Sequence, residues 1–208
     1  MATQKKSTPK KRTKRQPRPS TPHEVFPPLP TYSPSIVRKK FPIVSWHEFI
    51  ATGFFSGYLP KAPGTWGSLC AVFLFYFIAQ FLPAQGSVSI GFLSLSWFAL
   101  FLGTLATFIG IYTSQKLADE WNEKDPGEIV IDEFAGIFFA CLLIPATPLA
   151  LLLAFLFIRV FDILKPGPIA SLQNLPGGRG IVLDDVLAGL FAAPLAFIFH
   201  WVFTKWIF

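Results

Sequence analysis

Long apolar segments restrict this chain to folds that can place them in a membrane. Of its 208 residues, 52% are hydrophobic and 14% are charged, and the mean hydropathy is +0.49. This composition is too apolar for an ordinary soluble domain. Four apolar segments span residues 69–82, 90–112, 134–160 and 186–208. A helix needs about 20 such residues to cross hydrocarbon, so we expect an all-α, multi-helix integral membrane bundle.

The N-terminal tail, residues 1–44, has the opposite character. Eleven of the chain's 18 Lys and Arg residues precede residue 41, among many Pro, Ser and Thr residues. Such a segment cannot bury a core, which predicts a disordered tail before one folded domain over residues 45–208. The basic run could contact anionic lipid headgroups. An organelle address and a purely solubilising role are alternatives, and nucleic acid is not expected as a partner because no aromatic residues are interleaved with the charges.

Acidic residues gather beside the apolar segments. Ten of the twelve lie between Asp119 and Asp185, in three blocks formed by residues 119–133, by Asp162 and by the pair Asp184 and Asp185. Carboxylates near hydrocarbon are costly unless something compensates them. Three converging blocks without a nearby histidine therefore suggest a divalent cation site, and Mg²⁺ is the cation that prefers oxygen ligands.

Two prolines interrupt the third apolar segment. Pro145 and Pro148 lack backbone N–H groups and disfavour one straight helix. A straight span would separate Asp162 from Asp132 by the thickness of the membrane, whereas a hairpin bent at the prolines returns both to one face. We therefore predict a proline-broken helical hairpin, with residues 116–133 and 166–185 on the cytoplasmic face, where the basic tail is also expected.

The first acidic block carries the signals of a helix start. Asp125 suits the N-cap, Pro126 the first helical position and Glu128 the third position of a capping box. A helix from there would place Glu128 and Asp132 on one face, with Gly136 leaving room for a ligand or a packed helix. Capping alone can explain Asp125 and Glu128. Asp132 precedes an apolar run, where a carboxylate without a function would destabilise the protein. A functional role is therefore favoured.

Charged residues of both signs recur at spacing three in the second block. Arg159, Asp162 and Lys165 would form a stripe along one helix side. The stripe is either a structural set of ion pairs or a site in which Asp162 ligates a cation. In the second case Arg159 and Lys165 would bind phosphate oxygens, arginine as a planar fork and lysine as a point charge.

Glycines precede the paired acids of the third block. Gly177 and Gly178 would let backbone N–H groups approach an oxyanion closely. Asp184 either caps the last helix or joins Asp185 as a ligand. Upstream of the first apolar segment, Lys61 lies in a stiff loop rich in Pro and Gly.

The residues after Lys61 resemble the start of a helix. Thr65 is a candidate N-cap of the first apolar helix. Lys61 and the free amides of that helix could receive a phosphate group.

Four ordered blocks resemble the signatures of the phosphatidylglycerophosphatase A family. They are GFFSGYLPKAPGTWGS at 53–68, IVIDE at 129–133, RVFDILKP at 159–166 and GGRGIVLDD at 177–185. The resemblance covers about residues 45–208, with departures at Ile158, Gly167 and Arg179. It implies a Mg²⁺-dependent phosphatase that converts phosphatidylglycerophosphate to phosphatidylglycerol in bacterial phospholipid synthesis. It further implies a multi-pass protein of the inner membrane, in contact with membrane lipids, with its active site on the cytoplasmic face.

The resemblance and the residue chemistry together define the expected site. The cation ligands are Asp132, Glu133, Asp162, Asp184 and Asp185. The catalytic residues are Asp132, Asp162, Asp185 and Lys61, and the substrate-binding residues are Lys61, Arg159, Lys165, Gly177 and Gly178. No covalent phosphoenzyme is indicated, because the motifs that carry one are absent from the sequence.

Two other functions stay open from the sequence. An ion-coupled transporter would also use intramembrane carboxylates and a broken helix. An inactive lipid-binding scaffold is disfavoured because every acidic block is intact. The oligomeric state is left open.

Overall fold

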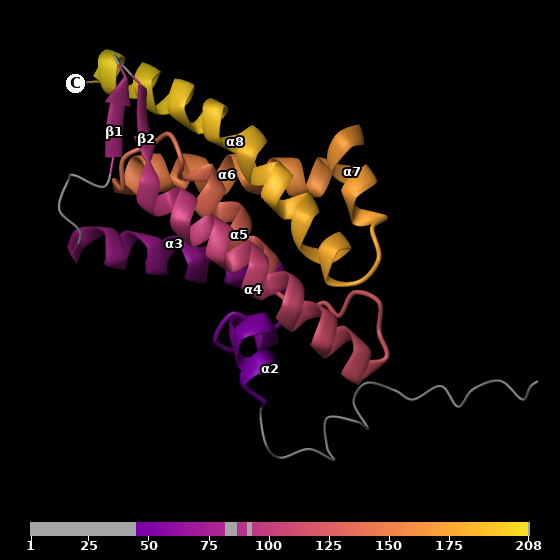
Figure 1. Ribbon diagram of the computed structural model, residues 1–208. Coiled ribbons are helices and arrows are strands. Elements are labelled where there is room, and N and C mark those ends of the chain that lie inside the picture. Colours follow the sequence, from indigo (N-terminus) through magenta and orange to yellow (C-terminus); the bar gives the residue numbers. More distant parts are fainter. Residues whose placement is uncertain (1–44, 82–86, 91–92, 208) are drawn as a thin grey trace, which may run out of the picture. The chain divides into compact units, whose positions relative to one another are not determined.

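The protein is a bundle of helices with one short β-hairpin (Figure 1). The computed structural model describes residues 45–81, 87–90 and 93–207. The elements are α2 (Trp46–Ala51), the 3-10 helix η1 (Ser56–Tyr58), α3 (Pro63–Phe81), β1 (Ser87–Ile90), β2 (Leu93–Ser96), α4 (Trp97–Trp121), α5 (Ile131–Ala140), α6 (Pro148–Leu164), α7 (Gly167–Gln173) and α8 (Gly178–Ile207). The expected all-α class is confirmed. The predicted disordered tail lies outside the described residues.

Three helices are long and apolar enough to cross a membrane, namely α3, α4 and most of α8. Their outward faces carry exposed aromatic side chains, among them Phe73, Phe77, Phe101, Phe108 and Trp206. An apolar surface of this extent suits contact with lipid chains and not with water. The chain is therefore a membrane protein, as its composition predicts.

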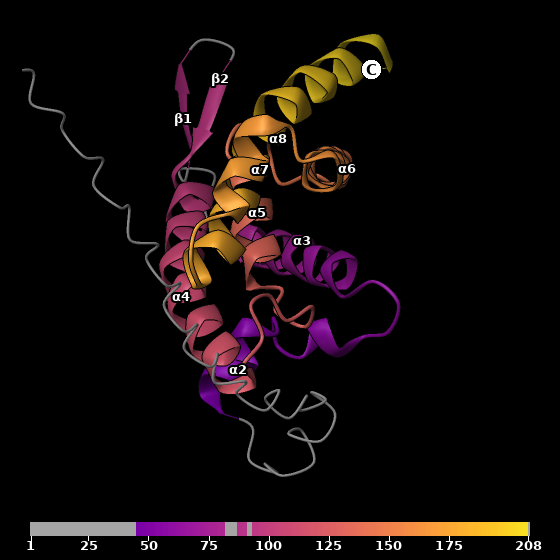
Figure 2. The same cartoon turned by 90° about the vertical axis from the view of Figure 1, so that its right-hand side faces the viewer.

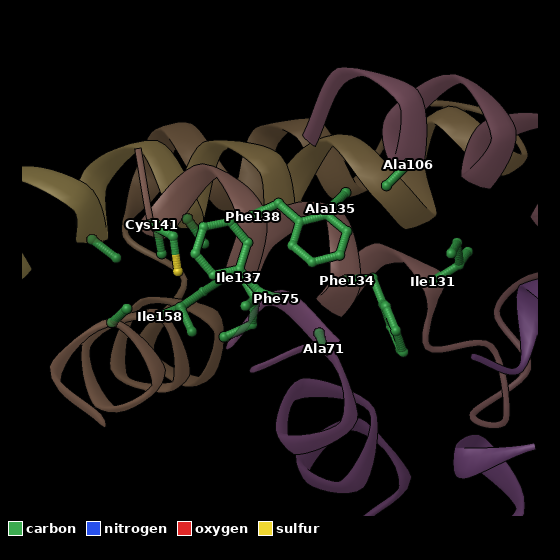
Figure 3. Packing of buried hydrophobic residues seen from close by; sticks show 14 of the residues in the cluster. Ala71, Phe75, Ala106, Ile131, Phe134, Ala135, Ile137, Phe138, Cys141 and Ile158 are labelled. Atoms are coloured by element: carbon green, nitrogen blue, oxygen red, sulfur yellow. The ribbon is translucent and has the colours of Figure 1, made fainter. Parts of the chain in front are cut away.

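Helix α5 lies at the centre of the bundle. Nine of its ten residues are buried, and its side chains contact α3, α4, α6 and α8. Figure 3 shows Phe138 beside Phe75 of α3, with Ile158 of α6 approaching from another side. The rings of Phe75 and Phe138 are 6.1 Å apart between centroids. Ten helical residues rise only about 15 Å. Helix α5 is therefore a buried helix that covers only about half of the hydrocarbon thickness.

Two glycines let α5 and α8 cross closely. A Cβ built on Gly189 would lie 2.2 Å from the carbonyl oxygen of Gly136. A Cβ on Gly136 would lie 2.8 Å from the carbonyl oxygen of Asp185. Small residues at such crossings allow the backbones to approach and increase the packing contact between helices in lipid. The space expected beside Gly136 is thus filled by a helix.

The predicted hairpin of the third apolar segment is confirmed. Helix α5 ends at Ala140, and α6 begins with Pro148 at its first turn, where a missing N–H costs nothing. Arg159, near the end of α6, comes within 3.9 Å of Glu133 at the start of α5. The prolines therefore lie in and beside the bend, and the chain returns to the level of Asp132.

The helix predicted from Asp125 is wrong in its start, because α5 begins at Ile131. Tertiary contacts outweigh the capping signal. The N–H of Val130 donates to the carbonyl oxygen of Ala51 at 2.9 Å. The segment also passes so close to Gly57 that a Cβ there would lie 2.0 Å from the carbonyl oxygen of Glu128. Glu128 and Asp132 consequently do not share a helix face.

The second apolar segment also begins differently from the expectation. Residues 87–90 and 93–96 form an antiparallel pair, in register from Ser87 with Ser96 to Ile90 with Leu93. Serine alternates with an apolar residue in both strands, which is the period of a strand. Helix α4 starts only at Trp97, and it continues nine residues beyond Tyr112.

Helix α2 is anchored on the polar end of α4. The Nε2 atom of His47 lies 2.9 Å from the Glu120 carboxylate, and the ring of Trp46 stacks on that of Tyr112 at 5.9 Å. These contacts hold the chain that leads into the loop before α3. The loop therefore starts from a fixed point beside the bundle.

Candidate active site

Three helices bring five carboxylates to one end of the bundle. Helix α5 supplies Asp132 and Glu133 from its first turn, α6 supplies Asp162 near its last turn, and α8 supplies Asp184 and Asp185 from its second turn. One carboxylate oxygen each from Asp132, Glu133 and Asp185 lies within 4.8 Å of the others. The three sequence blocks therefore converge as predicted.

Asp184 is not the cap of α8, which was one of its two expected roles. Helix α8 begins at Gly178, so Asp184 and Asp185 lie inside it and both are 3% exposed. The helix starts early because Gly178 packs on α4, which fixes its first turn several residues before the apolar run. Both carboxylates point into protein and are available as ligands of one site.

Two cations lie among the five carboxylates. The Lys165 ammonium is 2.6 Å from Oδ2 of Asp184 and 3.4 Å from Oδ1 of Asp162. The Arg159 guanidinium is 3.1 Å from Oδ2 of Asp162 and 3.9 Å from Oε1 of Glu133. Asp162 is thus held between them. The stripe predicted on α6 is real, and it faces the site.

The position of Lys165 follows from the end of α6. The residue has a φ of 41° at the C-cap, and Pro166 cannot continue the helix. Burial acts to lower the pKa of Lys165, but its hydrogen bond to Asp184 and the charges of Asp184 and Asp162 outweigh burial and raise the pKa. Lys165 therefore stays positively charged at physiological pH and acts as a charge, not as a base.

The carboxylates have more acceptor capacity than the described protein groups use. Oδ1 of Asp132, Oε2 of Glu133 and Oδ1 of Asp184 are buried and lack a hydrogen-bond partner among the described residues. Unpaired buried carboxylate oxygens are costly, and five like charges cannot all be ionised beside only two cations. An added cation would remove both costs. The oxygen-only donor set fits Mg²⁺, which takes carboxylate and water ligands.

Two further residues position Arg159, and the sequence reasoning gave them no role. Nη1 of Arg159 donates to Oγ of Ser68 at 3.3 Å, and the Ser68 hydroxyl donates to the carbonyl oxygen of Gly64 at 2.9 Å. A Cβ on Gly64 would lie 2.2 Å from Oε1 of Glu133. Gly64 and Ser68 are small residues four apart on α3, and this spacing was the available signal of a close helix contact.

The loop before α3 lies outside this network. Lys61 is exposed, has a φ of 76° and makes no ion pair with the carboxylates of the described chain. Its catalytic and phosphate-binding roles stay predictions. Thr65 is not the N-cap that the sequence suggested, because α3 already starts at Pro63. The start of α3 nevertheless borders the site through Gly64.

The glycines of the third block serve a helix contact. Gly177 has a φ of +63°, and the N–H of Gly178 donates to Oε1 of Gln115 at 2.8 Å. A Cβ on Gly178 would lie 2.1 Å from the carbonyl oxygen of Ile111. The Gly178 amide is therefore engaged by α4. Substrate binding by Gly177 and Gly178 stays a prediction.

Comparison with known proteins decides the family. The sequence profile described as Phosphatidylglycerophosphatase A matches residues 49–200. This chain belongs to the phosphatidylglycerophosphatase A family. The match includes every carboxylate and both cations of the site. As a member of the phosphatidylglycerophosphatase A family, the protein is a phosphoric monoester hydrolase that acts on lipid.

Bacterial relatives cover most of the chain. A protein named phosphatidylglycerophosphatase A from Haemophilus influenzae is 36% identical over 79% of this chain and 95% of its own length. The protein of the same name from Escherichia coli is 35% identical over 75% of this chain and 85% of its own. A protein of Bacteroides thetaiotaomicron, named as a candidate phosphatidylinositol-3-phosphatase, is 37% identical over 74% and 92%.

No solved structure shows significant similarity to the chain. The family match and the named relatives support a phosphatase, and none of them supports an ion-coupled transporter. Membership in the phosphatidylglycerophosphatase A family also argues against an inactive scaffold, since the chain has the converging carboxylates together with Arg159 and Lys165.

Proposed function

We propose that this protein hydrolyses phosphatidylglycerophosphate to phosphatidylglycerol and inorganic phosphate, with Mg²⁺ as cofactor, in bacterial phospholipid synthesis. The names of two relatives support this substrate. The observation that carries the proposal is the partly buried cluster of five carboxylates with Arg159 and Lys165 at one end of a membrane bundle. A site with both signs of charge suits a phosphate group bound next to a cation.

Mg²⁺ would be held by Asp132, Glu133 and Asp185, whose oxygens already lie within 4.8 Å of one another. Asp162 and Asp184 are the remaining candidate ligands. When bound, the ion would polarise the phosphoryl group and lower the pKa of a water molecule. The unpartnered oxygens of Asp132 and Glu133 are the support for this assignment.

The cationic side chains would bind the phosphate. Arg159 can present two N–H groups to two phosphate oxygens, and Ser68 and Asp162 keep its guanidinium oriented. Lys165, charged at physiological pH, would offset the charge that develops on the phosphoryl oxygens. Both cations would exchange part of their contact with carboxylates for contact with the substrate.

The reaction needs one water molecule and one proton relay. The water oxygen attacks phosphorus, the bond between phosphorus and the glycerol oxygen breaks, and the glycerol oxygen leaves with a proton. A carboxylate of the cluster would accept a proton from the attacking water and donate a proton to the leaving glycerol oxygen. Glu133, Asp184 and Asp185 are buried, and Asp132 and Asp162 are partly exposed, so the cluster can receive both water and substrate.

We further propose the bacterial inner membrane as the location, with the carboxylates on the cytoplasmic face. The relatives are bacterial, and the basic residues before residue 41 favour a cytoplasmic N-terminal side. Membrane lipids would then surround α3, α4 and α8, and the substrate would enter from the lipid phase.

Phosphate release from lipid substrates in mixed micelles tests the proposal. We expect phosphatidylglycerophosphate to be hydrolysed faster than phosphatidylinositol 3-phosphate and phosphatidic acid. Excess chelator should abolish release, and added Mg²⁺ should restore it. Undiminished release in chelator would refute the cation site, and faster hydrolysis of the inositol lipid would reassign the substrate.

Carboxylate variants test the shared site. Asp132→Asn, Asp162→Asn and Asp185→Asn should each reduce turnover by at least about a hundredfold, because each removes a charged oxygen that other contacts cannot replace. Asp125→Asn is the matched control, since Asp125 is exposed and forms no ion pair with Arg159 or Lys165 among the described residues, and its effect should be mild. Wild-type rates in any two of the three cluster variants would contradict one common site.

A further inference from the structure

A groove between α4 and the start of α8 lies apart from the carboxylate cluster. It encloses about 580 Å³ and is lined by residues that include Phe108, Tyr112, Gln115, Lys116, Gly177 and Arg179. The two helix segments are side by side in Figures 1 and 2, and the hydrogen bond from the Gly178 N–H to Gln115 joins them. The groove is therefore built on a fixed helix contact.

The α4 side of the groove changes from apolar to cationic along one face. Phe108, Tyr112 and Lys116 recur every four residues, so they form one stripe that rises about 12 Å. Phe108 is 71% exposed and Tyr112 is 51% exposed. A tyrosine between an apolar residue and a cation along one helix face is typical of a membrane interface. The stripe therefore matches a phospholipid in polarity, from acyl chain to headgroup.

The polar end of the groove carries two cations without acidic partners. Lys116 and Arg179 are exposed, and neither forms an ion pair with a carboxylate of the described residues. Lys116 lies 5.9 Å from the ring centroid of Tyr112. The nearby Asp119 accepts a hydrogen bond from Nε2 of Gln115 at 2.8 Å, so its charge is partly satisfied.

The start of α8 adds to this positive potential. The helix is 30 residues long and begins at Gly178, so the positive end of its dipole lies at the polar end of the groove. Two side-chain cations and a helix N-terminus at headgroup level favour an anion. The apolar side chains of the groove next to these cations favour an anion that carries acyl chains.

The groove and the carboxylates lie on different sides of α8. Arg179 and Asp185 are six residues apart, which corresponds to about 9 Å along the axis and about 120° around it. We propose that the groove binds an anionic glycerophospholipid at a site separate from the catalytic one. The lipid phosphodiester lies between Lys116 and Arg179, and an acyl chain lies along Phe108.

Such a lipid would stabilise the joint between α4 and α8. A ligand that binds only the folded protein raises the temperature of unfolding in proportion to the logarithm of its concentration. The effect can be measured without phosphate release. Failure of this proposal is thereby distinguishable from failure of the proposed catalytic function.

The test uses the full chain in neutral detergent, titrated with phosphatidylglycerol. We expect saturable binding by native mass spectrometry and a rise in the unfolding temperature. Lys116→Gln and Arg179→Gln should each weaken binding about fivefold, because a basic residue near an anionic headgroup contributes about this factor. Lys116→Arg should bind like the wild type. Lys205→Gln removes the same charge at the other end of α8 and should change nothing.

Three results would overturn the proposal. Equal binding of phosphatidylcholine would show that the anionic headgroup is not recognised. Equal stabilisation by inorganic phosphate or glycerophosphate would identify a phosphate site and not a lipid site. Equal loss of binding in Lys205→Gln would show a general charge effect. In the Lys116 and Arg179 variants, hydrolysis of a short-chain substrate should stay within about twofold of the wild type, and a parallel loss would contradict a separate site.

Discussion

Replacing Gly189 with alanine tests whether the crossing of α5 and α8 sets the geometry of the carboxylate cluster. The new Cβ would lie 2.2 Å from the carbonyl oxygen and 2.9 Å from the carbonyl carbon of Gly136. Carbon and carbonyl oxygen normally approach to about 3.3 Å. Both atoms belong to helix backbones, so no side chain can move aside. The two helices must therefore separate locally by about 1 Å.

The expected loss follows from what each helix carries. Overpacking of this kind costs about 1–3 kcal/mol of stability. Asp185 lies one turn before Gly189 on α8, and Glu133 lies nearly one turn before Gly136 on α5. A shift of about 1 Å between catalytic groups can cost about a hundredfold in rate. We therefore expect turnover of Gly189→Ala to fall between tenfold and a hundredfold, by these estimates.

The assay measures phosphate release per folded molecule, together with the unfolding temperature in the same detergent. Gly127→Ala and Gly167→Ala are the controls, since a Cβ at either position meets no atom within 4 Å. Both controls should keep wild-type turnover and a wild-type unfolding temperature. If Gly189→Ala also keeps both, the helix crossing does not determine the site, and the reasoning is wrong.

Three other predictions follow from contacts of the site. Ser68→Ala removes a hydrogen bond to the Arg159 guanidinium and should raise KM about tenfold, because such a bond contributes about 1.5–3 kcal/mol; unchanged steady-state kinetics would contradict this role. Lys165→Met leaves Asp184 without its cation and Asp162 with Arg159 alone, and it should lower the free energy of unfolding by about 3–5 kcal/mol. Since the folded-state pKa of Lys165 is raised, its stabilising effect is complete below its ordinary pKa of about 10.4 and is lost as pH rises through the folded-state pKa. Unfolding curves of the wild type should show this alkaline loss, and those of Lys165→Met should lack it. Cysteines placed at positions 123 and 174, in a Cys70→Ala/Cys141→Ala background, should react with an impermeant reagent from the same side of the membrane; labelling from opposite sides would refute the hairpin.

Local chemical signals explain the predictions that succeeded. Pro145 and Pro148 disfavour a continuous helix at a defined place, and the charges of Arg159 and Lys165 require partners wherever the chain puts them. These constraints act within a few residues or through strong charge pairing. The hairpin and the converging carboxylates could therefore be derived from the amino-acid sequence alone.

Long-range contacts decide the features that the sequence concealed. Residues 125–130 have the signature of a helix start, but the hydrogen bond between Val130 and Ala51 pulls the segment into turns. The pairing of Ser68 with Arg159 joins residues 91 positions apart, which no local pattern reports. The β-hairpin was hidden because an apolar average over residues 90–112 removes the two-residue alternation that marks its strands.

The central position of α5 has a consequence for how the protein is made. A helix of ten residues with two acids in its first turn is too short and too polar to be released into lipid alone. Helices α3 and α4, which pack on α5, are synthesised before it, whereas α6 and α8, which also pack on it, follow it in the chain. The packing around α5 is therefore complete only after α8 has been synthesised. Packing of α8 then closes the core and completes the carboxylate cluster.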